Sequence, residues 1–249
     1  MKKYIPGESK AERKQRKTIE KLKKLQSKSL DKQTVESTNI SNNNNLDTNK
    51  NLNSPIAFVL GNGISRKDID ITLLQTYGKV YACNAIYRTS QPDYLIAVDT
   101  KMMKEIIQSG YHQTNIVYTN PNRFTREFDN INLFTPNLGW SSGPSALNLA
   151  STHGYSTIYI LGFDYQGVGE NNGLVNNLYS GTENYKGSND RATYFGNWSR
   201  QTGICIRKYP EIKYIRVVED ENSFVPDNIT NMENLKHITK QNFINNLSK

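Results

Sequence analysis

The 249-residue sequence is poor in cysteine and histidine, and it contains no long apolar run. Its two cysteines, Cys83 and Cys205, stand inside short apolar stretches, which predicts small core residues rather than a disulfide or a structural zinc site. No segment reaches the roughly 20 apolar residues of a membrane span. The basic N-terminus lacks the apolar core of a signal peptide. We therefore expect a cytoplasmic protein with no transmembrane segment and no metal bound by cysteine or histidine.

Most of the chain also lacks an excess of charge of either sign. Residues 1–30 contain eleven Lys/Arg and three Asp/Glu, a net charge of +8 that equals the net charge of the whole sequence. Lysine and arginine therefore balance aspartate and glutamate over residues 31–249. The basic isoelectric point reflects the N-terminal stretch, and it gives no reason to expect nucleic-acid binding by the rest of the chain.

Composition divides the chain into four parts. Residues 1–28 combine capping-box spacing with many basic helix formers, which predicts a basic helical tail. We expect residues 1–30 either to bind nucleic acid or another polyanion, or to be a solubilising extension. Residues 29–54 are rich in Asn and Ser, which is typical of a disordered linker. A globular domain is expected over residues 55–226 and a C-terminal helix over residues 227–249.

Short apolar runs alternate with helical or loop stretches throughout the expected globular domain. Strands are predicted at residues 56–60, 80–84, 94–98, 115–118, 157–161 and 212–218. A helix is predicted over residues 100–109, ended by Gly110, and another over residues 190–209. Such alternation is typical of an α/β fold, so we expect a Rossmann-like, mainly parallel sheet with flanking helices.

The first predicted strand is followed by the turn Gly61-Asn62-Gly63. The two glycines lack a Cβ, so the backbone there can approach a phosphate or a sugar closely. Asn62 offers a donor and an acceptor at the carboxyl end of the strand, where open α/β sheets bind their ligands. The same pattern also occurs in turns that simply end a strand. Asn84 is the last residue of the second predicted strand.

A second candidate element is the helix start at Ser142-Gly143-Pro144-Ser145. Serine before an apolar helical pattern is typical of a helix N-terminus, and proline is favoured in the first turn. Free backbone N–H groups and the helix dipole attract an anion at such a position. We therefore expect an anion near Ser142, Gly143 and Ser145, unless the serine only caps the helix.

Two acids, Asp99 and Asp164, stand just past the ends of predicted strands, and Tyr165 follows the second of them. Acids at the carboxyl edge of a sheet can hold a cation, bind sugar hydroxyls or cap the next helix. The segment that follows, residues 166–190, is long and rich in Gly, Asn and Tyr. Loops of this length are usually lids or binding loops, or they are disordered.

Together, these pieces resemble the bacterial sialyltransferases of glycosyltransferase family 42, and a related family that contains motility accessory factors and hydroxymethylpterin-pyrophosphokinase-like proteins. The resemblance covers residues 56–165. It is carried by three motifs in this sequence: Gly61-Asn62-Gly63, Cys83-Asn84, and the Ser142-Gly143 helix start leading to Gly162-x-Asp164.

The resemblance to sialyltransferases implies a CMP-sugar bound by Asn62, Asn84, Ser142 and Gly143, with the reacting centre beside Asp164 and Tyr165. Those enzymes use a later histidine as the base, whereas this sequence has no histidine between His153 and His237.

Three functions remain open at this point. The first is glycosyl transfer from a nucleotide-sugar, for which the sequence indicates no certain cofactor. The second, implied by the pyrophosphokinase-like relatives, is phosphoryl or pyrophosphoryl transfer with Mg²⁺ held by Asp99 and Asp164. The third is a non-catalytic interaction protein of a virus such as a phage, acting in the host cytoplasm. The missing histidine and the Asn-rich composition favour this third function.

Overall fold

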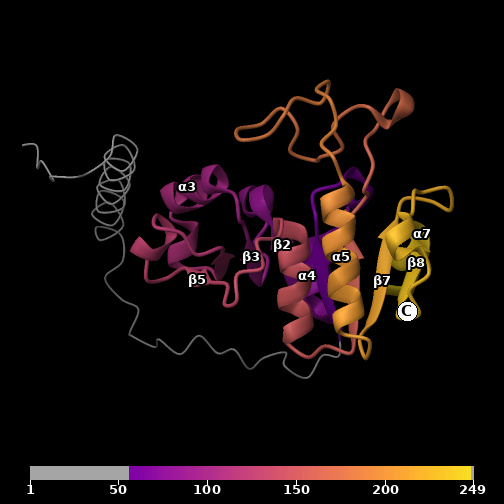
Figure 1. Cartoon of the computed structure of the whole chain (residues 1–249), viewed down its shortest axis with the longest axis horizontal. Coiled ribbons are helices and arrows are strands. Elements are labelled where there is room, and N and C mark those ends of the chain that lie inside the picture. The colour runs from indigo at the N-terminus through magenta and orange to yellow at the C-terminus, as the bar shows by residue number, and fades with distance from the viewer. Residues whose placement is uncertain (1–55, 248–249) are drawn as a thin grey trace, which may run out of the picture.

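A single eight-stranded sheet runs through the residues that the computed structural model describes, which are residues 56–247 (Figure 1). The predicted tail and linker lie outside this range. The strands are β1 (Ile56–Leu60), β2 (Lys79–Cys83), β3 (Tyr94–Ile96), β4 (Val117–Thr119), β5 (Asn132–Leu133), β6 (Thr157–Leu161), β7 (Lys213–Val218) and β8 (Leu235–Thr239). The helices are α2 (Ile71–Tyr77), α3 (Thr100–Ser109), α4 (Ser142–Thr152), α5 (Gly196–Lys208), α6 (Asp227–Thr230) and α7 (Lys240–Leu247).

All neighbouring strands in the sheet are parallel, and their order is β5-β4-β3-β2-β1-β6-β7-β8. The chain builds outward from β1 to β5, returns through α4 to place β6 on the other side of β1, and then continues to β8. The order of the strands therefore reverses between β1 and β6. In open parallel sheets the crevice at the carboxyl ends of two such strands is where ligands bind.

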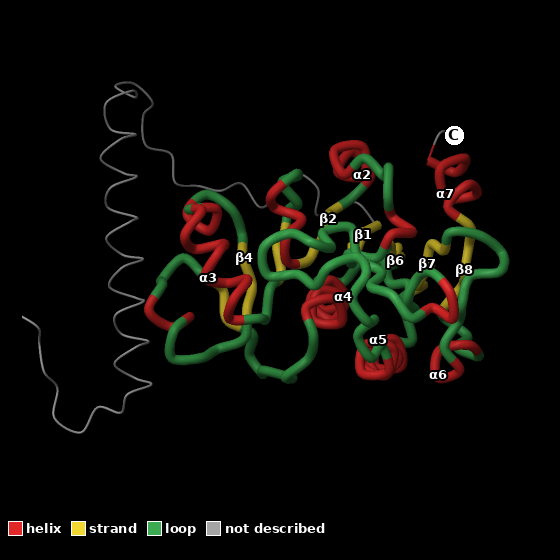
Figure 2. The backbone as a smooth tube through the Cα atoms, turned by 90° about the horizontal axis from the view of Figure 1, so that it is seen from above, coloured by secondary structure: helices red, strands yellow, loops and turns green. Residues whose placement is uncertain are grey.

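Helices cover both faces of the sheet, as Figure 2 shows for α2 and α7 on one side and α4, α5 and α6 on the other. The core is accordingly divided into two apolar layers. Phe58, Leu74 and Met103 belong to the layer beneath α2, α3 and α7. Val59, Leu147 and Cys205 belong to the layer beneath α4 and α5. Burial of β1 on both faces explains why it reads as a continuous apolar run.

The structure confirms the predicted α/β fold with a parallel, Rossmann-like sheet. β1 and β6 have the predicted limits, and α3 runs over the predicted residues and ends at Gly110, whose φ of 78° is left-handed. Cys83 and Cys205 are both buried and unpaired in the core, as expected. The other predicted strands are present with ends shifted by at most two residues, and α5 begins at Gly196 rather than at residue 190.

The prediction of one C-terminal helix over residues 227–249 is wrong. Residues 235–239 form the edge strand β8, which pairs with β7 over its whole length, and only the short α6 and α7 are helical there. The apolar residues Leu235 and Ile238 are three apart, a spacing that suggested a helix. Pairing with the exposed edge of β7 determines the outcome instead, because it satisfies the backbone groups along that edge.

Within residues 56–247, no helix is long and apolar enough to cross a membrane.

Candidate functional site

A cavity of about 460 Å³ lies at the carboxyl edge of the sheet, at the point where the strand order reverses. We call it the first cavity. Loops that follow β1, β2, β3, β4, β5 and β6 form its wall, together with the first turns of α4 and α5. Of the ten predicted site residues, the nine that line it are Gly61, Asn62, Gly63, Asn84, Asp99, Ser142, Gly143, Asp164 and Tyr165. The structure therefore brings together residues from five separate loops.

The turn after β1 lies directly against the loop after β6. The backbone N–H of Gly61 donates to the carbonyl of Leu161 at 2.8 Å, and that of Gly63 donates to the carbonyl of Gly162 at 3.0 Å. This close approach leaves no room for side chains. A Cβ on Gly63 would lie 2.5 Å from Oδ2 of Asp164 and 2.8 Å from the carbonyl oxygen of Gly162. Glycine is thus required at position 63 by contact with Asp164.

We expect the Gly63→Ala variant to unfold with a free energy lower by about 1–3 kcal/mol, because the added methyl group must displace the carboxylate of Asp164. The backbone of Gly63 itself, with φ of −64° and ψ of 151°, is open to any residue. Gly173→Ala is a matched control, since its Cβ would meet only the Glu170 carbonyl oxygen, at 3.5 Å. Urea unfolding measures both variants, and equal stabilities would contradict the argument.

Asn62 is held in one orientation by two neighbours. Its Nδ2 donates to the hydroxyl of Tyr185 at 3.1 Å, and its Oδ1 accepts from Nη2 of Arg66 at 3.3 Å. Arg66 is itself buried, and its Nε donates to the carbonyl of Gly61. One N–H and one lone pair of the Asn62 amide remain for a ligand.

Asn84 and Ser142 connect the loop after β2 to the start of α4. The hydroxyl of Ser142 donates to Oδ1 of Asn84 at 2.8 Å and accepts from the backbone N–H of Val98 at 3.1 Å. Asn84 has a left-handed backbone with φ of 55°, a conformation that asparagine adopts more readily than most residues. Since its amide oxygen is occupied, Asn84 can offer a ligand the two N–H groups of its amide nitrogen.

The start of α4 presents backbone donors to the first cavity. Ser141 precedes the helix without a side-chain cap, so the N–H groups of Ser142 and Gly143 lack a capping partner from it. Ser145 is the one predicted residue that does not line the first cavity. Its hydroxyl donates instead to the carbonyl of Trp140 at 3.3 Å, which fixes the loop that carries Trp140 into the cavity wall.

The two predicted acids have different surroundings. The carboxylate of Asp164 accepts from both the backbone N–H and the hydroxyl of Ser65, so Asp164 caps the short 3₁₀ turn Ile64–Arg66. Asp99 precedes α3, but its side chain makes no capping hydrogen bond and is exposed to the first cavity. Although Asp164 already accepts two hydrogen bonds from Ser65, each of its carboxylate oxygens can still accept one from a ligand.

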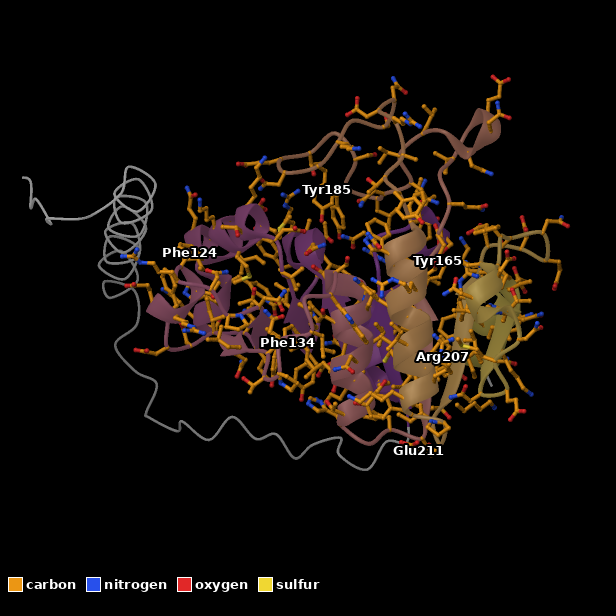
Figure 3. All side chains as sticks on the ribbon, in the orientation of Figure 1. Phe124, Phe134, Tyr165, Tyr185, Arg207 and Glu211 are labelled. Carbon is orange, nitrogen blue, oxygen red and sulfur yellow. The ribbon has the colours of Figure 1, made fainter. Side chains whose placement is uncertain are left out.

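Tyr165 lines the first cavity but directs its hydroxyl into the protein. The hydroxyl donates to Oγ1 of Thr202 on α5 at 2.8 Å, and Figure 3 shows Tyr165 beside this helix. The guanidinium of Arg216 stacks over the ring, 5.0 Å from its centroid. Burial raises the pKa of Tyr165 well above its usual value, so the phenol stays protonated at neutral pH. A role for Tyr165 at the reacting centre stays a prediction.

The long segment after β6 is ordered and lies above the upper ends of α4 and α5 in Figure 1, drawn in orange. Its Tyr185 hydroxyl accepts hydrogen bonds from Asn62 and from the backbone N–H of Ala85. Arg88 connects the same segment to α3. It donates to Glu105 on α3 through Nε and Nη2, and to Oγ1 of Thr182 in the segment through Nη1. The segment is therefore a fixed wall of the site in this structure.

Sequence reasoning missed part of the cavity wall, including four of its five aromatic side chains. The lining residues that were not predicted include Asn120, Trp140, Asn176, Asn177, Phe195 and Trp198. Phe195 and Trp198 pack edge to face with centroids 5.3 Å apart. Asn120 directly follows β4, but the strand predicted there ends at residue 118, so the sequence pattern points one residue short of it. The aromatic residues lack a comparable signal in the sequence.

Among the residues that line the first cavity, the charged ones are Asp99 and Asp164, and the wall contains no lysine, arginine or histidine. Cys83 also lines it, but burial raises the pKa of this thiol to about 12, which makes it inert as a nucleophile at neutral pH. Residues 56–247 hold no cluster of three or more His, Cys, Asp or Glu side chains that could bind a metal ion.

The fold and the position of the first cavity together define the structural class of the protein. The described residues form an α/β protein with an all-parallel, Rossmann-like sheet and a polar, aromatic-lined cavity at its switch point. No protein-family model, curated protein or solved structure matches the chain.

Proposed function

We propose that the first cavity binds a nucleotide-sugar, most simply a CMP-sugar, and that the protein transfers the glycosyl group to a hydroxyl acceptor. The observation that carries the proposal is the convergence of nine predicted residues on one cavity at the switch point of the sheet. Ligands of open parallel sheets bind at this position.

Each part of such a donor has a matching group in the wall. Trp140, Phe195 and Trp198 offer faces on which a base or a sugar ring can stack. The amides of Asn62 and Asn84 offer directed hydrogen bonds to a base or to ribose hydroxyls. These partners suit a nucleoside better than a purely apolar ligand.

The phosphate would lie at the start of α4, where the N–H groups of Ser142 and Gly143 and the helix dipole favour an anion. Because the wall has no cationic side chain and carries two carboxylates, it compensates little negative charge. A donor with one phosphate therefore fits better than a donor with a diphosphate, which favours CMP over UDP or GDP.

In the transfer step, the oxygen of an acceptor hydroxyl forms a bond to the anomeric carbon of the sugar. The bond from that carbon to the phosphate oxygen breaks, and CMP leaves with the electron pair. Asp164 takes the proton of the acceptor hydroxyl. None of the three histidines, His112, His153 and His237, lines the first cavity, so a carboxylate is the best-placed base.

We expect CMP to raise the thermal stability of the full chain without added metal. A ligand present at a hundred times its dissociation constant stabilises the folded state by about 2.7 kcal/mol. The measurement is a thermal unfolding series with CMP, CDP, UDP, GDP and ATP, each with and without Mg²⁺. The Gly143→Trp variant, which fills the start of α4, should lose the effect of CMP. Absence of any shift with all five nucleotides would overturn the proposal.

Phosphoryl transfer is the second candidate, because Asp99 and Asp164 line the same cavity and carboxylates are the usual protein ligands of Mg²⁺. In the same series this function predicts stabilisation by ATP only when Mg²⁺ is present.

A further inference from the structure

A second cavity, of about 490 Å³, adjoins the first one on the far side of the switch point. It lies beyond the turn that follows β1, and its wall includes residues from the end of β7 and from the loop that follows it. Asp164, Gln166 and Asn176 line both cavities. Each cavity falls within the size range of small-molecule sites, about 300–1,000 Å³.

Asp164 stands at the border between the two cavities. Its carboxylate is held there by Ser65, which lines the second cavity, and by the close approach of Gly63, which lines the first. A group bound in either cavity can therefore reach the same carboxylate. A transferase with two substrates requires this arrangement, in which one base adjoins the sites of both.

The two walls differ in chemistry. The first cavity has five aromatic side chains, whereas the lining of the second has none among the described residues. Besides Asp164, the second cavity contains charged side chains of both signs, which are Lys67, Asp68, Arg216, Glu219, Asp220 and Lys240. Its apolar side chains are aliphatic: Ile64, Val168 and Val218. A nucleobase that stacks on aromatic rings thus belongs in the first cavity, and a ligand rich in hydroxyl groups belongs in the second.

Arg216 lines the second cavity, and its side chain is held in place by hydrogen bonds. Its side chain is 3% exposed, and it donates to the carbonyls of Phe163 and Phe224 at 2.9 Å and to that of Asp164 at 3.2 Å. Three of its five N–H groups are used in this way, which fixes the position of the guanidinium. Lys67, at the rim, is exposed.

We propose that the second cavity is the acceptor site and that it takes a saccharide, one hydroxyl of which gives its proton to Asp164. The inference rests on the proposed function for the role of this site in transfer. The binding of a saccharide to the second cavity is independent of which donor occupies the first.

The test measures binding of the full chain to an array of printed mono- and oligosaccharides, alongside the CMP titration. We expect the wild type to bind a subset of the array. Asn222→Trp places a large ring at an exposed position of the second cavity and should lower that signal at least tenfold. Lys67→Ala, a milder change at the rim, should lower it by a smaller factor. Asn246→Trp, on the exposed side of α7 and outside both cavities, should leave it unchanged.

The thermal unfolding midpoint of each variant shows whether it is folded. A wild-type chain that binds no saccharide, or a folded Asn222→Trp variant that binds as well as Asn246→Trp, would overturn the inference. If saccharide binding is lost in Asn222→Trp while CMP has no effect on the wild type, the second cavity stands as a saccharide site and the proposed donor is wrong.

Discussion

Replacing Asp164 with asparagine is expected to lower the rate of glycosyl transfer by about 10²- to 10⁴-fold, the usual contribution of a general base. Asparagine has the same shape and keeps an oxygen that can accept from the backbone N–H of Ser65, while its amide nitrogen can donate to the Ser65 hydroxyl. The cap of the 3₁₀ turn therefore survives the substitution. Only the capacity to take a proton is lost.

The measurement is the release of CMP from a CMP-sugar in the presence of a saccharide acceptor, with CMP binding followed separately. Asp129→Asn is the matched control, because Asp129 is exposed and lies outside both cavities. If transfer by the Asp164→Asn protein stays within a few-fold of the control, Asp164 is not the base. If CMP still binds while transfer is lost, the defect lies in the chemical step.

The sequence predicts those features of the site that depend on residues adjacent in the chain. Buried parallel strands read as apolar runs, and the polar residue that follows each run lies at the carboxyl edge of the sheet. This rule predicts that Asn62, Asp99 and Asp164 share one edge, and all three line the first cavity, as does Asn84, which the family resemblance indicated. It depends only on residues adjacent in the chain.

The contacts that hold these residues in place are not local. Tyr185 binds the side chain of Asn62 across 123 positions of the sequence, and nothing near either residue indicates the pair. Trp140 likewise reaches the wall because Ser145 and α4 hold its loop there. β8 was missed for a similar reason, since a five-residue segment becomes a strand only because β7 offers an unpaired edge.

Asp164 itself depends on a buried arginine in the neighbouring strand. We expect Arg216→Met to lower the free energy of unfolding by about 3–5 kcal/mol, because it leaves three carbonyl oxygens, those of Phe163, Asp164 and Phe224, without their donors. Methionine fills much of the volume of the arginine side chain, so little empty space is created. The decrease in the free energy of unfolding therefore reports mainly the three lost hydrogen bonds.

Arg207→Met is the control for this change. Arg207 is exposed on α5 and makes one long contact, 3.5 Å from the carbonyl of Asn228, so its removal should cost less than about 0.5 kcal/mol. Urea unfolding compares the two variants. Arg216→Lys should fall between them, because an ammonium group keeps the charge but cannot reach three carbonyls with a planar fork. Equal midpoints for Arg216→Met and Arg207→Met would show that the loop carrying Asp164 is held by other contacts, such as the backbone bonds to the turn after β1.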